Sequence, residues 1–500
     1  MKKHIFLFLG AILAFLGCSD DDSIKNGPTP QPNPGSELDV QHFMWQSMNL
    51  WYFWQAEVND LADDRFSTDA QYTDYLEANP DPEAFYTNKL VHGEDRFSFF
   101  NEDYTELVRN LGGVSKSHGV EFKLWLDSNN TNNVYGVVLY VLPGSDGATK
   151  DIQRGDGFTR VNGVQLTTAN YINLLFGDND TYTLGMADIE SEIDGDFINF
   201  YPVDTDREVS LTKTANLVED PIFVAKTLDV GGTKVAYLMY NRFLGSFDEQ
   251  LNQAFGDFKA DGATELILDM RYNPGGSVNS SRLLASMVYG TNTSDLYIRQ
   301  RWNAKIQAQL SASDLEDYFA DKTKTSNGTA INSLNLNRVF VLATEDSASA
   351  SELVMNGLEP YVDVIHIGET TRGKNEFSIT LVDDIEGAFI YSEARENKIN
   401  PDNHWGLQPL VGRNENADGF YDYTSGLVPD IPYAEYPSEM GVLGEVDEPL
   451  LARALQEISG VSAKMALHLQ PTVETVGSSR LHTPLADNMY LDKPLDIQMD

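Results

Sequence analysis

The stretch EDSASASELVMNGLEP, residues 345–360, places three serines in alternation with alanines at the start of a helical pattern. The preceding run VFVLAT is typical of a buried strand, so Ser347 and Ser349 are predicted to lie in a strand-to-helix turn. The free N–H groups and partial positive charge of a helix N-terminus stabilise an oxyanion. Serine is also a common N-cap residue, but one cap needs only one serine. The turn is therefore a candidate position for a serine nucleophile.

A serine hydroxyl attacks readily only when a base accepts its proton, and a lysine is placed to do so. The run DVIHIGETTRGKNEF reads as a strand followed by a glycine-containing loop that presents Lys374. Burial among apolar strands lowers the pKa of a lysine towards neutrality, because desolvation disfavours the ammonium form. For Lys374 taken alone, a solvated surface lysine is the alternative. A further strand, LILDMRYNPGG, ends in Gly275-Gly276, whose unobstructed N–H groups could donate to an oxyanion.

The elements that must bring these residues together form an α/β region that begins near residue 220. Strand-like runs KVAYLMY, TELILDM, NRVFVLAT and DVIHIGE alternate with the helical patterns DEQLNQAFGDFKADG and SRLLASMVYG. Continuous apolar strands of this kind predict a sheet that helices cover on both faces. In such sheets, functional sites collect where strands end and helices begin. We therefore expect Ser349 and Lys374 to meet at one edge of the sheet.

Together these motifs closely resemble the C-terminal processing peptidases, the tail-specific serine proteases of family S41. The resemblance implies that the middle serine of S-A-S-A-S-E, Ser349, is the nucleophile and that Lys374 of a G-K motif is its base. The interval, 374 minus 349 or 25 residues, fits the family arrangement. The resemblance also implies oxyanion donors at the backbone N–H of Ala350 and at Gly275 or Gly276 of the N-P-G-G loop.

One position departs from the family pattern. Many members carry a glutamine four residues after the lysine to orient it, whereas this chain has Ser378 there. Either Ser378 or another residue takes the place of the glutamine, or the lysine is oriented differently, which bears on rate and pH optimum more than on reaction type. Farther on, Gly426 and Pro429-Asp430 match the family's G-x-x-P-D, and we interpret this segment as a wall of the substrate cleft.

Between the helical start of the chain and the α/β region, short runs rich in Val, Tyr and Leu alternate with Gly, Asn and Asp, which is typical of strands. The run VVLYVLPGSDGATKDIQRGDGFTRVNGVQL resembles a PDZ domain, with Asn162-Gly163 at a hairpin turn. PDZ domains bind a chain terminus by adding a strand to a sheet edge, and loop N–H groups receive the carboxylate. A purely structural role would leave the same pattern. The residues that would form the loop and its strand are Gly119, Val120, Glu121 and Phe122.

The first residues of the chain resemble an export signal. Lys2 and Lys3 precede an apolar run, Ile5 to Phe15, that is too short to span a bilayer comfortably. The run ends in Leu-Gly-Cys, and Cys18 is the only cysteine, so no intramolecular disulfide can form. The pattern resembles a bacterial lipoprotein signal, as in Bacteroidetes members of the family, with an ordinary signal peptide as the alternative. It implies an exported outer-membrane lipoprotein, on the periplasmic face or at the cell surface, that the lipid alone attaches.

These patterns predict a multidomain α/β protein, and 500 residues at roughly 150 per domain suggest about three domains. Aromatic residues at helical spacing in the first module are interpreted as core, without chemistry. The predicted segments are a signal peptide (1–17), an acidic and proline-rich tether (18–37), a small N-terminal helical module (38–110), a PDZ-like β-rich domain (111–215), an S41 peptidase core of crotonase/ClpP-like ββα type (216–462) and a tail without recognisable motif (463–500).

Charge and motifs narrow the function further. The chain has 35 basic and 76 acidic residues, and the resulting charge of -41 argues against a nucleic-acid partner. No H-E-x-x-H motif occurs, and the sequence demands neither a metal nor an organic cofactor. A Ser-His-Asp hydrolase would use His404, but its usual G-x-S-x-G is absent around Ser349.

Two functions remain after these exclusions. The motifs favour a serine endopeptidase that acts on unfolded or C-terminally exposed polypeptides. The alternative is a catalytically weak or inactive lipid-anchored scaffold that binds peptides or glycans, for which the departure at Ser378 leaves room. The sequence predicts no particular oligomeric state.

Overall fold

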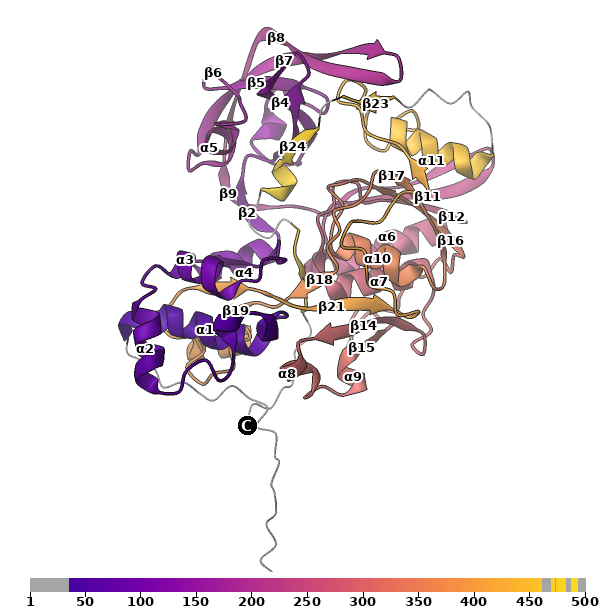
Figure 1. Ribbon diagram of the computed structural model, residues 1–500. Coiled ribbons are helices and arrows are strands. Elements are labelled where there is room, and N and C mark those ends of the chain that lie inside the picture. The colour runs from indigo at the N-terminus through magenta and orange to yellow at the C-terminus, as the bar shows by residue number, and fades with distance from the viewer. Residues whose placement is uncertain (1–35, 461–468, 473, 483–486, 493–500) are drawn as a thin grey trace, which may run out of the picture.

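The computed structural model describes residues 36–460, 469–472, 474–482 and 487–492. Figure 1 shows three bodies: a helical module in indigo, a β-rich domain in purple and magenta, and an α/β core in pink and orange. The predicted multidomain α/β class is confirmed. The predicted signal peptide, Cys18 and nearly all of the tether lie outside the described residues. Within those described, no helix combines the length and apolar character needed to cross a membrane.

The N-terminal module is helical, and its aromatic residues are core, as predicted. Trp45 and Trp51 of the first helix are each 1% exposed. That helix ends at Trp51, and just beyond it the Phe53 N–H donates to the Leu410 carbonyl of the core (2.9 Å). The elements of the module are η1 (Ser36–Leu38), α1 (Asp39–Trp51), η2 (Gln55–Glu57), η3 (Asn59–Leu61), α2 (Asp69–Glu77), α3 (Pro82–Phe85), the π-helical turn η4 (Tyr86–Leu90), β1 (Phe99–Asn101) and α4 (Tyr104–Leu111).

The β-rich domain is built on an antiparallel sheet with one short helix. The predicted Asn162-Gly163 turn has positive φ at both residues, 52° and 77°, as a two-residue hairpin requires. Its elements are β2 (Val114–Ser117), β3 (Val120–Asp127), β4 (Asn130–Val141), η5 (Gly147–Thr149), β5 (Gly157–Val161), β6 (Val164–Gln165), α5 (Tyr171–Phe176), β7 (Thr181–Asp194), β8 (Phe197–Thr212) and β9 (Thr214–Val218). Strand β9 pairs with β2, and the large sheet runs β8-β7-β5-β4-β3 with β6 beside β5.

The α/β core contains a six-stranded sheet that is parallel from its second strand onward. Its order is β10 (Ile222–Val230), β11 (Thr233–Tyr240), β12 (Glu265–Asp269), β16 (Arg338–Ala343), β17 (Asp363–Gly368) and β22 (Ile431–Pro432). Because side chains alternate along a strand, Leu268 packs with the helices of one face and Ile267 with those of the other. The first face carries α6 (Asp248–Ala260), α7 (Val278–Val288) and α10 (Ala350–Leu358), and the second carries α11 (Pro449–Ser459).

A second sheet lies beside these helices and joins the core to the helical module. Its order is β13 (Gly276–Ser277), β25 (Met489–Tyr490), β18 (Glu376–Ser378), β21 (Leu410–Asn416), β14 (Leu296–Trp302) and β15 (Glu316–Tyr318). A three-stranded sheet pairs β1 of the module with β20 (Gly406–Gln408) and β19 (Leu381–Val382). The remaining short helices are η6 (Gly245–Phe247), α8 (Ala304–Gln307), α9 (Ala312–Leu315), η7 (Glu393–Lys398) and η8 (Ser479–Leu481).

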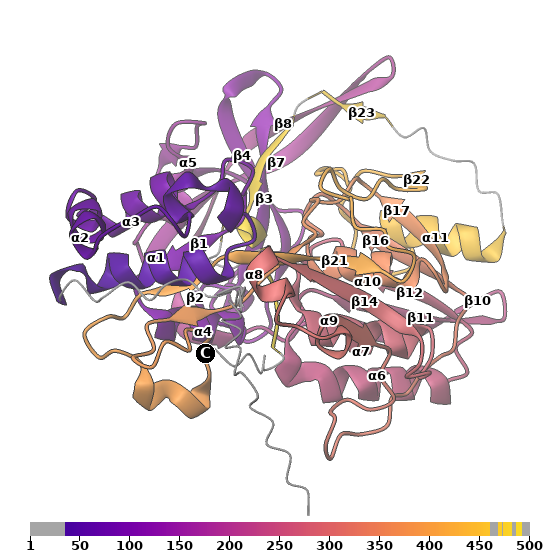
Figure 2. The ribbon, with the colours of Figure 1, turned by 60° about the horizontal axis from the view of Figure 1, so that its bottom comes forward.

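The tail, for which no sequence pattern predicts a structure, supplies strands to two different sheets. Strand β23 (Gln470–Pro471) pairs with β8, and β24 (Thr475–Ser478) runs antiparallel to β3. Strand β25 lies between β13 and β18 of the core. In both ribbon views the yellow strand β24 follows the edge of the β-rich domain (Figures 1 and 2).

Candidate active site

Ser349 lies in the turn between β16 and α10, as predicted, and its backbone is unusual. Its φ is +60° with a ψ of -114°, and its side chain is completely buried. A non-glycine residue with positive φ is held there by its surroundings at a cost of about 1–3 kcal/mol, and such residues cluster at functional sites. The Ser349 Oγ donates to the carbonyl oxygen of Asp487, 2.6 Å away.

The other two serines of the motif hold the turn in place. Ser347 Oγ donates to the Met270 carbonyl just beyond β12 (2.8 Å). Ser351 Oγ donates to the Asn273 carbonyl of the glycine loop (2.8 Å). Both hydroxyls are therefore used within the scaffold, whereas the Ser349 hydroxyl is directed at the tail residue Asp487.

Lys374 reaches the same tail residue from the loop before β18. Its Nζ lies 2.6 Å from the Asp487 carbonyl oxygen and 3.4 Å from Asn488 Oδ1. The Ser349 hydroxyl and the Lys374 amine therefore converge on one oxygen atom. The side chain is 1% exposed, which excludes the alternative of a solvated surface lysine. Burial lowers the pKa of Lys374, although neighbouring carboxylates, Asp487 foremost, act in the opposite direction.

The helical module contributes two residues to the surroundings of the lysine. The Phe97 ring lies 4.9 Å from Lys374 Nζ, and Arg96 donates to the Gly373 carbonyl (2.5 Å). No sequence pattern indicates this contact, because Arg96 and Gly373 are 277 residues apart in the chain. Phe97 lies outside the helices of the module, so it does not belong to the aromatic residues at helical spacing that were interpreted as core.

Glu352, the last letter of the S-A-S-A-S-E motif, connects the serine turn to the lysine loop. One carboxylate oxygen accepts the N–H groups of Ser349 (2.8 Å) and Lys374 (2.9 Å). The other oxygen accepts the Gly373 N–H (2.7 Å) and the Thr371 hydroxyl (2.5 Å). Complete burial raises the pKa of Glu352 to about 7 in spite of these donors. The S-x-x-E spacing of a capping box was the signal that could have identified it.

The predicted oxyanion donors lie beside Ser349. Gly275 and Gly276 have φ values of +116° and +136°, which L side chains rarely adopt. A Cβ on Gly275 would lie 2.5 Å from the Ser349 Cβ and 3.1 Å from the Ala350 nitrogen, so only glycine leaves the space before that N–H open. The Gly275 N–H itself donates to Asn273 Oδ1 (2.9 Å), and Gly276 pairs with Met489 of the tail.

Ser378 is buried close to the lysine, but its hydroxyl contacts other residues. It donates to Asn488 Oδ1 (2.5 Å) and to the Met489 carbonyl (3.1 Å). The Ser378 Oγ also accepts the side-chain N–H of Gln408, which is fully buried on β20 (3.0 Å). A glutamine amide therefore reaches this region from another strand. No sequence pattern singles out Gln408.

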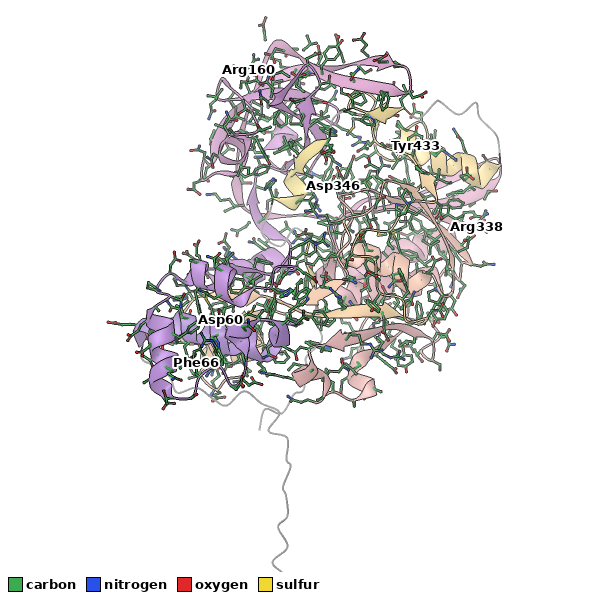
Figure 3. All side chains as sticks on the ribbon, viewed as in Figure 1. Asp60, Phe66, Arg160, Arg338, Asp346 and Tyr433 are labelled. Carbon is green, nitrogen blue, oxygen red and sulfur yellow. The ribbon has the colours of Figure 1, made fainter. Side chains whose placement is uncertain are left out.

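A buried ion pair joins the β-rich domain to the serine turn. Lys123 of β3 lies 2.7 Å from Glu345 and 3.1 Å from Asp346, at the start of the turn. Figure 3 labels Asp346 where the β-rich domain meets the core. Because Asp346 is only 1% exposed, the pair fixes the position of β3 relative to the turn that carries Ser349.

The predicted carboxylate-binding loop has its first donors already engaged. The N–H groups of Gly119 and Val120 donate to the side chains of Ser117 (3.0 Å) and His118 (3.1 Å). The Phe122 N–H donates to the Ser479 hydroxyl of the tail (2.8 Å). That hydroxyl in turn donates to Glu121 (2.6 Å). The edge of β3 is thus occupied by a segment of the same chain.

The predicted closing segment packs against the lysine loop, and His404 belongs to another surface. A Cβ on Gly426 would lie 2.1 Å from the Thr371 carbonyl oxygen, and one on Gly373 would lie 2.4 Å from the Thr424 carbonyl oxygen. His404 is exposed and stacks on Tyr104 of the helical module. The described part of the chain holds no group of three or more His, Cys, Asp or Glu residues that could bind a metal ion.

The fold and the site indicate a class of protein, the hydrolases. The strand ends of the α/β core bring a buried serine and a buried lysine to one carbonyl oxygen. Family models then identify the class more closely. Residues 234–408 match peptidase family S41, and residues 39–99 match the peptidase S41 N-terminal domain. The chain therefore contains an S41 peptidase domain, and the predicted resemblance to that family is confirmed, whereas the PDZ-like domain and the lipoprotein signal stay predictions.

Two relatives agree with this assignment. A carboxyl-terminal-processing protease of Picosynechococcus sp. is 22% identical over 287 residues, which are 55% of this chain and 58% of that protein. The match thus spans little more than half of the curated relative. A crystal structure of a Bacteroides fragilis NCTC 9343 protein assigned to the S41 proteases is 25% identical, with a TM-score of 0.62. It covers 84% of this chain and 97% of that chain.

Proposed function

We propose that this chain is a serine endopeptidase of the C-terminal processing type that uses Ser349 and Lys374 as its catalytic pair. The observation that carries the proposal is the convergence of Ser349 Oγ and Lys374 Nζ on one carbonyl oxygen, each at 2.6 Å. Both groups are buried, and the peptidase S41 match spans them. Burial of this kind favours a neutral amine, which is the form that accepts a proton.

The chemistry follows from these positions. Ser349 attacks the carbonyl carbon of a peptide bond while Lys374 accepts its proton and passes it to the leaving amine. The backbone N–H of Ala350 and a glycine of the N-P-G-G loop stabilise the tetrahedral oxyanion, for which Gly275 leaves space. Water then hydrolyses the acyl-enzyme, with Lys374 as the base. The substrates would be unfolded or C-terminally exposed polypeptides, which can enter as extended strands.

A fluorophosphonate probe, which labels activated serines, tests the proposal on the full chain together with cleavage of an unstructured protein. We expect labelling and cleavage by the wild type and neither by Ser349→Ala. Ser351→Ala is the matched control, because it removes a serine of the same motif and one hydrogen bond but not the nucleophile. Labelling of Ser349→Ala, or its cleavage of the substrate at the wild-type rate, would reject the proposal. Absence of both activities from the wild type would favour the inactive scaffold.

We also propose that the chain is an exported lipoprotein held at the outer membrane by lipid on Cys18. The support is the sequence pattern of Lys2-Lys3, an apolar run and Leu-Gly-Cys. Growth with a labelled fatty acid tests it: we expect incorporation into the wild type and none into Cys18→Ser. Equal incorporation into both would contradict lipidation at this residue.

A further inference from the structure

The tail strand β25 occupies a gap between two parts of the candidate site. It lies between β13, which contains Gly276, and β18, which follows Lys374. Pairing is parallel on both sides, with Gly276 opposite Met489 and Ser378 opposite Tyr490. Since neighbouring strands lie about 4.8 Å apart, β13 and β18 flank a gap one strand wide. An extended polypeptide could pair with both edges there.

The same tail also occupies the edge of the β-rich domain. Strand β24 is antiparallel to β3, with Ser478 opposite Lys123. On the other side, the Tyr171 hydroxyl of α5 donates to the Val476 carbonyl (3.3 Å), and the Phe176 ring stacks on His482 with centroids 4.1 Å apart. The tail therefore lies between a strand edge and a helix, in the manner of a peptide bound by strand addition.

We infer that residues 475–482 and 487–492 form an intramolecular plug that occupies both surfaces at which the enzyme would hold a polypeptide, so that substrate must displace it. The inference rests on the proposed function and adds a resting state in which the active site is covered. Its occupant is known, because the chain itself supplies it.

The seat of the plug matches it in charge as well as in backbone pairing. Arg480 of the tail is 5% exposed and forms an ion pair with Glu219 (2.9 Å). It also donates to the carbonyls of Asn241 (2.5 Å) and Tyr272 (3.2 Å), and Tyr272 begins the loop that leads to Gly275. A charge is buried at acceptable cost only where partners are arranged for it. This arrangement indicates a dedicated site for Arg480.

At the catalytic end, the plug engages both reactive groups without presenting a cleavable geometry. The Ser349 hydroxyl donates to the Asp487 carbonyl oxygen, as does Lys374. A substrate carbonyl oxygen would instead face the oxyanion donors, so that the hydroxyl oxygen meets the carbonyl carbon. Beyond this point, Leu491 N–H donates to the Ser378 carbonyl (3.1 Å) and Ser277 donates to Asp492 (2.6 Å). The plug therefore contacts both reactive groups and continues along the strands that flank them.

A release variant of the full chain tests the inference. Leu491→Pro deletes the N–H that donates to Ser378, and His482→Ala deletes the ring that stacks on Phe176. We expect the double variant to raise kcat/KM for a short unstructured peptide by about 10-fold or more, which corresponds to a plug engaged in about 90% of wild-type molecules or more. Glu474→Gln, at an exposed position just before the plug, is the control and should equal the wild type.

A second measurement does not depend on catalysis, and thermal unfolding checks that the release chain is folded. A fluorescent peptide with the sequence of residues 475–492 is added to the wild-type and release chains, each with Ser349→Ala, and binding is followed by anisotropy. We expect at least about 10-fold tighter binding to the release chain, since its site is open. A peptide of the same composition in scrambled order should bind neither chain.

Several results would overturn the plug. One is equal kcat/KM in the wild-type and release chains when thermal unfolding shows both to be folded. Another is equal peptide binding by the two Ser349→Ala chains. A third is a wild-type chain shortened between Asp487 and Asn488 while Ser349→Ala stays intact, because the tail would then be a substrate. Tight peptide binding by the release chain without cleavage by any variant supports the plug and rejects the proposed peptidase. Failure of the plug and failure of the peptidase proposal therefore give different results.

Discussion

Lys374→Met lowers kcat/KM by about 10⁴-fold, to the level of Ser349→Ala, because the side chain keeps its length but can no longer accept a proton. The two residues act as one unit in the proposed mechanism, so the double variant should lose little more than either single variant. The measurement is steady-state cleavage of a quenched fluorescent peptide by the full chain. Thermal unfolding of each variant checks that the loss is not one of folding.

The pH profile separates a base from a structural lysine. Lys374 must be neutral to accept the proton of Ser349, and burial lowers its pKa from 10.5. Wild-type kcat/KM should therefore rise with pH and level off above the lowered pKa of Lys374. Below that pKa, kcat/KM should be lower because the amine is protonated. His404→Ala is the control, since His404 is exposed against Tyr104, and it should leave rate and profile unchanged. Loss of activity in His404→Ala with retained activity in Lys374→Met would contradict the Ser–Lys pair.

The local order of the site could be read from the sequence because the relevant signals are short. Apolar runs of strand length, followed by glycines or by a serine-rich helix start, locate β12 and β16 and the turns after them. Ser349 and Gly275 belong to such turns, and their positive φ values agree with positions where a strand must give way abruptly.

Contacts between distant parts of the chain could not be predicted in the same way. Phe97 reaches Lys374 from the helical module, and Gln408 reaches Ser378 from β20. Each contact depends on how whole elements pack, and neither residue lies in a motif. The tail illustrates the same limit most clearly: two-residue strands such as β25 have no periodicity of their own and form because β13 and β18 offer unpaired edges.

Gln408 contacts Ser378, the residue at which this chain departs from the family pattern. Lys374 lies in the loop before β18, and Ser378, four residues later, is the last residue of that strand. Here a serine stands on that strand and receives a hydrogen bond from a glutamine on the neighbouring sheet (3.0 Å). The Ser378 hydroxyl itself donates to Asn488 of the tail.

Glu352→Gln should lower kcat/KM by about 10²–10³-fold without abolishing folding. Each carboxylate oxygen of Glu352 accepts two hydrogen bonds. The backbone N–H groups of Ser349 and Lys374 donate to the same oxygen, Oε2. An amide has a single oxygen, so its NH₂ group must face two donors whichever way it turns. Unsatisfied buried donors cost about 1–3 kcal/mol each. The hydrogen bonds lost are those that hold the nucleophile Ser349 and the base Lys374 in position relative to each other.

The pH dependence of stability distinguishes Glu352→Gln from a variant that is destabilised in general, because Glu352 titrates in the folded protein. Burial raises the pKa of Glu352 to about 7, so folding favours the protonated form. Its contribution to the free energy of unfolding is complete below the ordinary carboxyl pKa of about 4.5 and is lost as pH rises towards 7. Glu352→Gln should make the fall in stability between pH 4.5 and 7.5 smaller, measured by urea unfolding, while Asp248 and Glu369, whose pKa values burial also raises to about 7, keep their contributions.

Thr371→Val is the matched control for Glu352→Gln, because it deletes one hydroxyl donor to the same carboxylate and leaves the three backbone donors in place. We expect a loss in kcat/KM of about 10-fold or less, in keeping with one hydrogen bond to a charged group. If Thr371→Val and Glu352→Gln lost equal activity, the carboxylate would matter only as an acceptor for Thr371. An unchanged rate in Glu352→Gln would show that the serine turn and lysine loop keep their positions without it.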